Sequence, residues 1–207
     1  MQDYKATRWW CVRHALVPES AHKGLFYGGQ DVDCEPCDIK SKWLARTLPQ
    51  NASLITSDLR RTHQTADAIA LHGLSMQQRQ QHADLNEQSF GDWEQRTIAE
   101  VCDARTNPFW WSPAHTRAGG GESFADLYAR VSNCVASINN THAGKDIIAV
   151  THGGTIRAMV AFALKIPMDN ALNVNVDNQS LTLLEHFHGE GTDTWRAVYI
   201  NKLGEDI

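Results

Sequence analysis

Arginine and histidine follow three short apolar runs of this chain, close to the points where the runs end. Arg13 and His14 come directly after the first run, and His152 follows the third after one intervening residue, Thr151. Arg61 comes soon after the second. Guanidinium groups offer forked donors that match the oxygens of a phosphoryl group, and little acidic charge lies among these residues. Two arginines and two histidines brought together would therefore bind a small anion, and a phosphoryl group is the natural ligand.

The same residue types can also carry out chemistry on such a group. A histidine among arginines has its pKa lowered by like-charge repulsion, which leaves a neutral ring nitrogen able to attack phosphorus. The leaving alkoxide would need a proton, and Glu87, in a loop beside aromatic residues, could supply it if partial burial keeps the carboxyl protonated. The amides that begin a helix at Gly153 would add donors aimed at the same negative charge. These groups suffice for phosphoryl transfer without a metal.

The elements that must position these residues alternate between strands and helices. Continuous apolar runs are typical of strands buried on both faces, whereas helices repeat apolar residues on one side. The expected strands span 9–12, 52–56, 147–150, 180–187 and 195–201, and the expected helices span 39–48, 58–72, 97–104, 122–138 and a segment after Gly153. This alternation predicts an α/β fold, a three-layer α/β/α sandwich whose mostly parallel central sheet carries helices on both faces. Ligands of such sheets bind beyond the carboxyl ends of the strands, where the four groups would converge.

Composition excludes several classes of partner. Lys and Arg number 19 against 24 for Asp and Glu, so the net charge is −5, and no basic run offers a footprint for nucleic acid or an anionic membrane. No apolar stretch approaches the roughly 18 residues of a membrane span, and the charged N-terminus lacks the core of a signal peptide, so we expect a cytoplasmic protein. The chain shows no linker, repeat or low-complexity segment, which predicts a single domain over 1–207.

The five cysteines fit reduced thiols better than a disulfide framework, because their number is odd and three of them are widely scattered. Cys34 and Cys37 form a C-x-x-C pair, yet no second pair or closely spaced histidines complete a zinc site. Pro36 places the pair in a polar loop rather than at the start of a helix. We therefore expect incidental loop cysteines, and neither a metal nor a cofactor.

Four segments together resemble the histidine phosphatase superfamily, also called the phosphoglycerate mutase-like family. They are Arg13 with His14, SDLRRTHQTA over 57–66, LNEQSFGDWE over 85–94 and THGGTIR over 151–157. The segments span nearly the whole chain and stand in the order of the family. The resemblance implies the phosphoglycerate mutase-like fold and phosphoryl-transfer chemistry.

The resemblance also implies a role for each matching residue. His14 matches the nucleophile that becomes a phosphohistidine, and Glu87 matches the general acid. Arg13 and Arg61 match the arginines that hold the phosphoryl oxygens. His152 matches the second histidine, which stabilises the transferring group and contacts the substrate.

The chain departs from the family pattern after the nucleophile. Where glycine, then threonine and asparagine are usual, it has Ala15, Val17 and Ser20. Ala15 adds a methyl group where the backbone approaches phosphate, and the other two alter the polar contacts nearby. We expect the departures to affect contacts with the substrate more than the chemistry, with Ser20 and Gly153 among the substrate-binding residues.

Several other residues that could do chemistry have no such setting. The remaining histidines are expected to be solvated or incidental: His22, His63, His72, His82, His115, His142, His186 and His188. The segment 105–121 contains Trp110 and Trp111 and has two open interpretations, a lid that selects the substrate or simple packing.

We expect a metal-independent phosphomonoesterase that acts on a small phosphorylated metabolite. A metal hydrolase would need ligands at a spacing such as H-E-x-x-H, which the chain lacks. Two alternatives stay open: a mutase, although the short separation of Glu87 and His152 resembles the phosphatase branch, and a non-catalytic phosphate-ester-binding module. Among short members the chain is similar to α-ribazole phosphatases and broad-specificity phosphatases, and the sequence leaves open both the substrate and whether the chain forms a homodimer.

Overall fold

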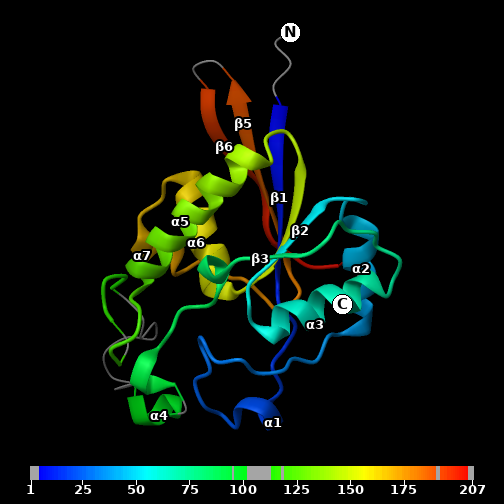
Figure 1. The fold of residues 1–207 in the computed structure, drawn as a ribbon. Coiled ribbons are helices and arrows are strands. Elements are labelled where there is room, and N and C mark those ends of the chain that lie inside the picture. Colours follow the sequence, from blue (N-terminus) through cyan, green and yellow to red (C-terminus); the bar gives the residue numbers. More distant parts are fainter. Residues whose placement is uncertain (1–4, 95, 102–112, 118, 190–191, 205–207) are drawn as a thin grey trace.

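Six strands form one sheet with helices on both of its faces (Figure 1). A computed structural model describes residues 5–94, 96–101, 113–117, 119–189 and 192–204. The strands are β1 (Lys5–Arg13), β2 (Ser53–Thr56), β3 (Gln80–Gln81), β4 (Asp146–Thr151), β5 (Leu181–Gly189) and β6 (Thr192–Lys202). The helices are α1 (Glu19–His22), α2 (Asp38–Thr47), α3 (Arg60–Ala70), α4 (Ile98–Val101), α5 (Phe124–Thr141), α6 (Gly153–Leu164) and α7 (Met168–Ala171).

The sheet order is β3-β2-β4-β1-β5-β6, and its central pairs are parallel. β4 lies between β2 and β1 and pairs in parallel with both, while β5 and β6 add antiparallel pairs at one side. In the register of β1 and β4, Arg13 lies opposite Thr151. The carboxyl ends of these two strands therefore meet at one edge, which confirms the predicted mostly parallel α/β sheet.

The two faces of the sheet bury separate cores because successive strand residues point to opposite sides. Trp9 and Cys11 of β1 pack among apolar residues of α5 and α6. Val12, the next residue of β1, points to the other face of the sheet and packs with apolar residues of α2 and α3. Figure 1 shows α5 and α6 on one side of the sheet and α2 and α3 on the other. The predicted three-layer arrangement is confirmed.

A local capping signal sets the start of α5, whereas several other element bounds differ from the predicted ones. α5 begins at Phe124 because Ser123 and Asp126 form a capping box, in which each side chain bonds the backbone N–H of the other. α2 begins at Asp38, one residue before the predicted start, and α3 begins at Arg60, two residues later than predicted. β3 was not predicted, because its two exposed glutamines carry no apolar signal. Of the helix expected over 97–104, the structure shows α4, and residues 102–104 lie outside the described ranges.

Candidate active site

The sheet edge brings together the four groups that follow the apolar runs. The His14 amide donates to the Thr151 carbonyl at 2.8 Å, so β1 stays aligned with β4 one residue beyond its end. The imidazole rings of His14 and His152 lie with centroids 5.1 Å apart. Arg61, in the first turn of α3, places its Nε 3.3 Å from Nδ1 of His152. The predicted convergence of these side chains is therefore present.

His14 is held as a neutral ring with one nitrogen available. Its side chain is buried, and Nδ1 lies 2.6 Å from the Ala15 carbonyl oxygen. A carbonyl only accepts, so Nδ1 carries the proton and the lone pair of the neutral ring is on Nε2. Burial, followed by the charges of Arg61 and Arg13, holds the pKa of His14 well below its usual value. The predicted lowering of the pKa is confirmed, although desolvation contributes more than repulsion.

His152 is a second neutral imidazole with both nitrogens bonded. Because a guanidinium only donates, Nδ1 of His152 accepts from Arg61 and its Nε2–H donates to Oγ of Ser57 at 2.8 Å. Burial, with the Arg61 charge next, lowers the pKa of His152 well below the usual value. The sequence analysis gives Ser57 no part in the chemistry, because a hydroxyl before a helix is typical of a helix cap.

The two arginines supply positive charge to the same edge. Arg61 is fully buried, and its terminal nitrogens donate to the carbonyls of Gln30 at 2.6 Å and Gly28 at 2.7 Å. Arg13 donates through Nη1 to the Val176 carbonyl at 2.5 Å. Among the described residues, the buried Nε of Arg13 has no hydrogen-bond partner. A buried donor of this kind needs an acceptor, and a phosphoryl oxygen would provide one.

Glu87 belongs to the loop that follows the 3₁₀ helix η1 (Ala83–Leu85), and its half-buried side chain lies next to the first residues of α6. Both oxygens of its carboxylate lie within 3.2 Å of the Gly154 amide. A Cβ at Gly154 would come within 2.4 Å of Oε1 of Glu87, so only glycine allows this approach. The sequence analysis predicts that the amides at the start of this helix bind the substrate anion. This prediction is wrong for Gly154, because its N–H donates to the carboxylate of Glu87.

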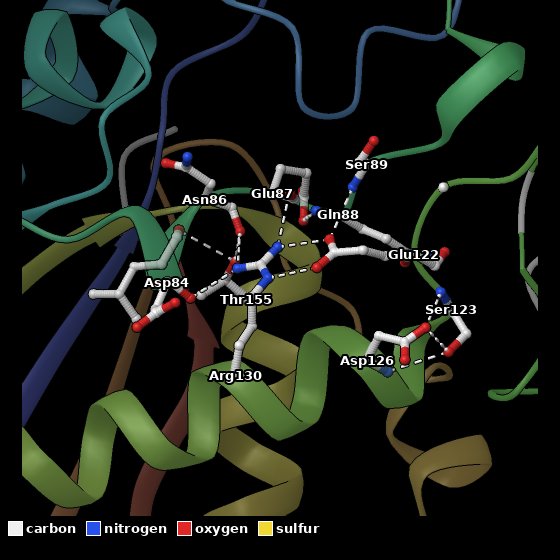
Figure 2. Close-up of polar contacts among 12 residues, drawn as sticks. Asp84, Asn86, Glu87, Gln88, Ser89, Glu122, Ser123, Asp126, Arg130 and Thr155 are labelled. Carbon is white, nitrogen blue, oxygen red and sulfur yellow. Dashed lines mark hydrogen bonds and ion pairs between the residues drawn. The ribbon is translucent and has the colours of Figure 1, made fainter.

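Arg130 of α5 holds the loop that carries Glu87, as Figure 2 shows. Its guanidinium donates to the carbonyls of Asp84 at 2.7 Å, Asn86 at 2.9 Å and Glu87 at 3.1 Å. It also forms a two-point ion pair with Glu122 at 2.7 and 2.8 Å. The sequence did not single out Arg130, because a polar residue on a helix is ordinarily solvated.

A cavity of about 450 Å³ opens in front of Arg13, His14 and Glu87, while Arg61 and His152 are fully buried behind its described lining. The described residues that line it are Arg13, His14, Leu16, Val17, His22, Gly24, Leu25, Phe26, Tyr27, Gly28, Glu87, Phe90 and Asn178. The nucleophile candidate and the acid candidate therefore face one common space. Tyr27, which the sequence analysis did not single out, also lines the cavity. The Cζ atom of Arg61 lies over its ring, 5.4 Å from the ring centroid, and burial raises the pKa of its phenol.

Other predicted positions fall differently. Ser20 is exposed on α1 and does not line the cavity in the part of the chain that is described, so the structure does not bring it to the site. Gly153 is buried against Arg13, where a Cβ would lie 3.4 Å from Nε. Val17 lines the cavity, and the Ala15 amide donates to Thr65 at 2.8 Å. Residues 105–112 and 118 of the expected lid, including both tryptophans, lie outside the described residues.

Metal ligands, thiols and helix lengths add three further findings. Within the described ranges, no cluster of three or more His, Cys, Asp or Glu side chains is placed to hold a metal ion. Four cysteines are described, Cys11, Cys34, Cys37 and Cys134, and each is a free thiol. None of the helices seen in the described ranges has the length and apolar character needed to cross a membrane.

The fold is that of an α/β protein in which the ends of parallel strands hold two buried, neutral histidines close to two arginines. A sequence profile of the histidine phosphatase superfamily (branch 1) matches residues 9–200, and the chain belongs to this superfamily. The resemblance drawn from the four sequence segments is thereby confirmed. The superfamily is one of phosphatases, so the chain is an enzyme of the phosphatase class.

Named relatives match between 82% and 95% of the chain. A protein of Hydrogenobacter thermophilus, provisionally named phosphoserine phosphatase 2, is 30% identical over 202 residues, which are 95% of this chain and 96% of that protein. The adenosylcobalamin/α-ribazole phosphatase of Escherichia coli is 26% identical over 82% of this chain and 85% of its own. The structure of a mycobacterial glucosyl-3-phosphoglycerate phosphatase has a TM-score of 0.78 and 27% identity, and covers 95% of this chain and 99% of its own.

Proposed function

We propose that the protein is a metal-independent phosphomonoesterase that works through a phosphohistidine on His14. The state of the His14 ring carries this proposal. Its Nδ1–H is committed to the Ala15 carbonyl, and its pKa is low, so the lone pair on Nε2 is free at neutral pH. The ring also lies on the wall of the 450 Å³ cavity, beside Arg13.

In the first step, Nε2 of His14 attacks phosphorus and the bond between phosphorus and the ester oxygen breaks. Arg13 and Arg61 stabilise the negative charge on the phosphoryl oxygens. His152 fixes Arg61 through the bond to Nε, and its own ring is fixed by Ser57. These contacts support an indirect role for His152, which positions Arg61 for the transferring group.

Glu87 gives its carboxyl proton to the departing oxygen, which leaves as an alcohol. In the second step, the Glu87 carboxylate takes a proton from a water molecule that attacks the phosphohistidine. The bond between nitrogen and phosphorus breaks, inorganic phosphate is released, and both residues return to their starting states. The shared cavity of His14 and Glu87 supports this division of roles.

We further propose that the substrate is a small phosphorylated metabolite and that the enzyme is cytoplasmic. The free thiols of the described cysteines support a reducing compartment. The names of the relatives, which include phosphoserine, α-ribazole and glucosyl-3-phosphoglycerate phosphatases, support a phosphate monoester as the substrate class.

A trapping experiment tests the intermediate. The enzyme is mixed with a phenyl ester of ³²P-labelled phosphate and quenched in alkali, where phosphohistidine survives and acid would hydrolyse it. We expect label on the wild type and on His22→Ala, a control that removes another histidine of the cavity wall, and none on His14→Ala. Unlabelled wild type that still releases phosphate would overturn the intermediate. Binding without turnover would support the non-catalytic module, and transfer of label to an added alcohol instead of water would support the mutase.

A further inference from the structure

The cavity in front of His14 is much larger than a phosphoryl group requires. Its volume of about 450 Å³ lies within the range of sites that bind whole small molecules. Arg13, His14 and Glu87 occupy only part of its lining. The rest of the wall therefore contacts the organic part of the substrate, and its chemistry reports what that part is.

Most of the remaining wall is apolar or aromatic. The chain between His14 and α2 contributes Leu16, Val17, Leu25 and Phe26, and Phe90 faces them from the loop after Glu87. The rings of Phe26 and Phe90 lie 5.7 Å apart in a tilted arrangement. Two segments distant in sequence thus meet to form one apolar surface beside the reacting groups.

Two further rings extend this surface. The rings of His22 and Tyr27 lie 5.5 Å apart, and both residues line the cavity. Leu16 lines it too, although 58% of its surface is exposed to solvent. A large apolar side chain left this exposed beside a reaction centre would lose its contact with water when an apolar ligand enters.

Fixed charge is scarce on the same wall. Of the described residues that line the cavity, Arg13 is the one permanent cation and Glu87 the one carboxyl group, and the proposed reaction uses both. The side-chain amide of Asn178 donates to the carbonyls of His14 at 3.0 Å and Ala15 at 3.3 Å, so its N–H groups already have acceptors. Among the described residues of this wall, a second anionic group such as a carboxylate would find no cation besides Arg13, because Arg157 lines a separate, smaller cavity together with Glu87 and Phe90.

We propose that the organic part of the substrate is uncharged and largely apolar, with a ring or a chain of several carbons that packs against Leu16, Leu25, Phe26 and Phe90. This inference rests on the proposed function, because it places the phosphoryl group at His14. It goes beyond that function by choosing among phosphate monoesters. The preferred esters are then those of apolar alcohols, and phosphorylated hydroxy or amino acids are poor substrates.

A homologous series of alkyl phosphates tests the proposal, because methyl, propyl, butyl and hexyl phosphate release alcohols of similar acidity. Chemistry is nearly constant along the series, and only the apolar surface changes. A buried methylene contributes about 0.8 kcal/mol, so we expect kcat/KM to rise about fourfold per carbon until the wall is covered. Phosphoserine and 3-phosphoglycerate should fall below butyl phosphate. A flat series, or a preference for either phosphorylated acid, would overturn the proposal.

Two leucine variants tie the effect to this wall. Leu16→Ser removes an exposed apolar side chain from the cavity, and Leu71→Ser removes one that is 87% exposed at the end of α3 and does not line the described cavity. Neither change opens a hole in the core. We expect Leu16→Ser to reduce the gain per carbon and Leu71→Ser to keep it. Equal slopes in both variants would place the apolar contact elsewhere and overturn the assignment.

Alkylphosphonates separate a failure of this inference from a failure of the proposed function. Their carbon–phosphorus bond is not hydrolysed, so calorimetry measures binding alone. Tighter binding with longer chains, but without turnover of any ester, would uphold the apolar subsite and overturn the phosphatase mechanism. Turnover of the esters with chain-independent binding of the phosphonates would do the reverse.

Discussion

The phosphate side of the site and the proton-donor side are built in different ways. Arg13 ends β1, His14 follows it, and His152 follows β4, so the hydrogen-bond register of the parallel pair β1–β4 sets their positions. Glu87 lies in a loop with no strand or long helix of its own. Its position depends on Arg130 and on the Gly154 amide. One half of the reaction is thus placed by backbone pairing and the other by side-chain bonds.

This difference separates what a substitution can disturb. Losing one side chain at the sheet edge leaves the backbone of β1 and β4 in place, because the strands are paired along their length. Losing Arg130 removes three bonds to carbonyls of the loop at once. We therefore expect changes on the phosphate side to affect single groups, and changes on the donor side to affect a whole segment.

The largest expected effect is that of His14→Ala. Removal of the nucleophile should lower kcat by about 10⁴-fold or more, while the fold persists because the backbone bond of residue 14 to Thr151 remains. Steady-state phosphate release measures the loss, and circular dichroism checks the fold. Activity within tenfold of the wild type would remove His14 from the mechanism.

Glu87→Gln should have the next largest effect, and only on some substrates. The amide cannot give up a proton, so esters of alkyl alcohols should lose about 10²–10⁴-fold in kcat. Activated aryl phosphates, which leave without a proton, should lose far less. Inhibition by inorganic phosphate, which depends on the arginines, serves as the control for an intact phosphate side. Equal losses for alkyl and aryl esters would contradict the acid role.

Arg130→Met should reproduce the Glu87 pattern more weakly, because it releases the loop without removing the carboxyl. We expect a loss of about 10–100-fold in kcat for alkyl esters and a smaller one for aryl esters, since misplacement of a catalytic group costs rate. Arg130→Lys, which keeps the charge, should recover part of it. Arg117→Met is a matched control. Arg117 also pairs with a carboxylate, that of Asp126 on α5, but it has no described bond to the loop of residues 84–89. A uniform loss across both ester types would indicate general unfolding instead.

The contrast between the two sides also explains what the sequence could predict. The strand ends were predictable because buried strands leave continuous apolar runs, and the polar residues after them must lie at the sheet edge. Glu87 was found through its family motif, but its partners were not, because Arg130 contacts it from another element with no local signal. The Gly154 amide was misassigned for the same reason. Ser20 was expected at the site from a motif position, whereas the path of the loop that leads to α1 leaves it exposed.

The smallest expected effect concerns stability and pH. The folded pKa values of His14 and His152 lie well below about 6.5, the usual value that we expect in the unfolded chain. Below that pH the unfolded chain binds protons that the folded protein excludes, so the free energy of unfolding falls as pH falls. The slope approaches about 1.4 kcal/mol per pH unit for each histidine.

His14→Gln should remove one of these two contributions. Urea unfolding between pH 7.5 and 5.5 should show a shallower loss of stability for this variant than for the wild type. His22→Gln, on the cavity wall, is the control and should keep the wild-type slope. Identical pH dependence in all three proteins would mean that the folded protein accepts the proton on His14, and a protonated ring could not serve as the nucleophile at low pH. Burial of His14 lowers its pKa and so keeps Nε2 unprotonated. The same burial makes the folded protein less stable at low pH. This measurement therefore links the loss of stability at low pH to the reactivity of His14 as a nucleophile.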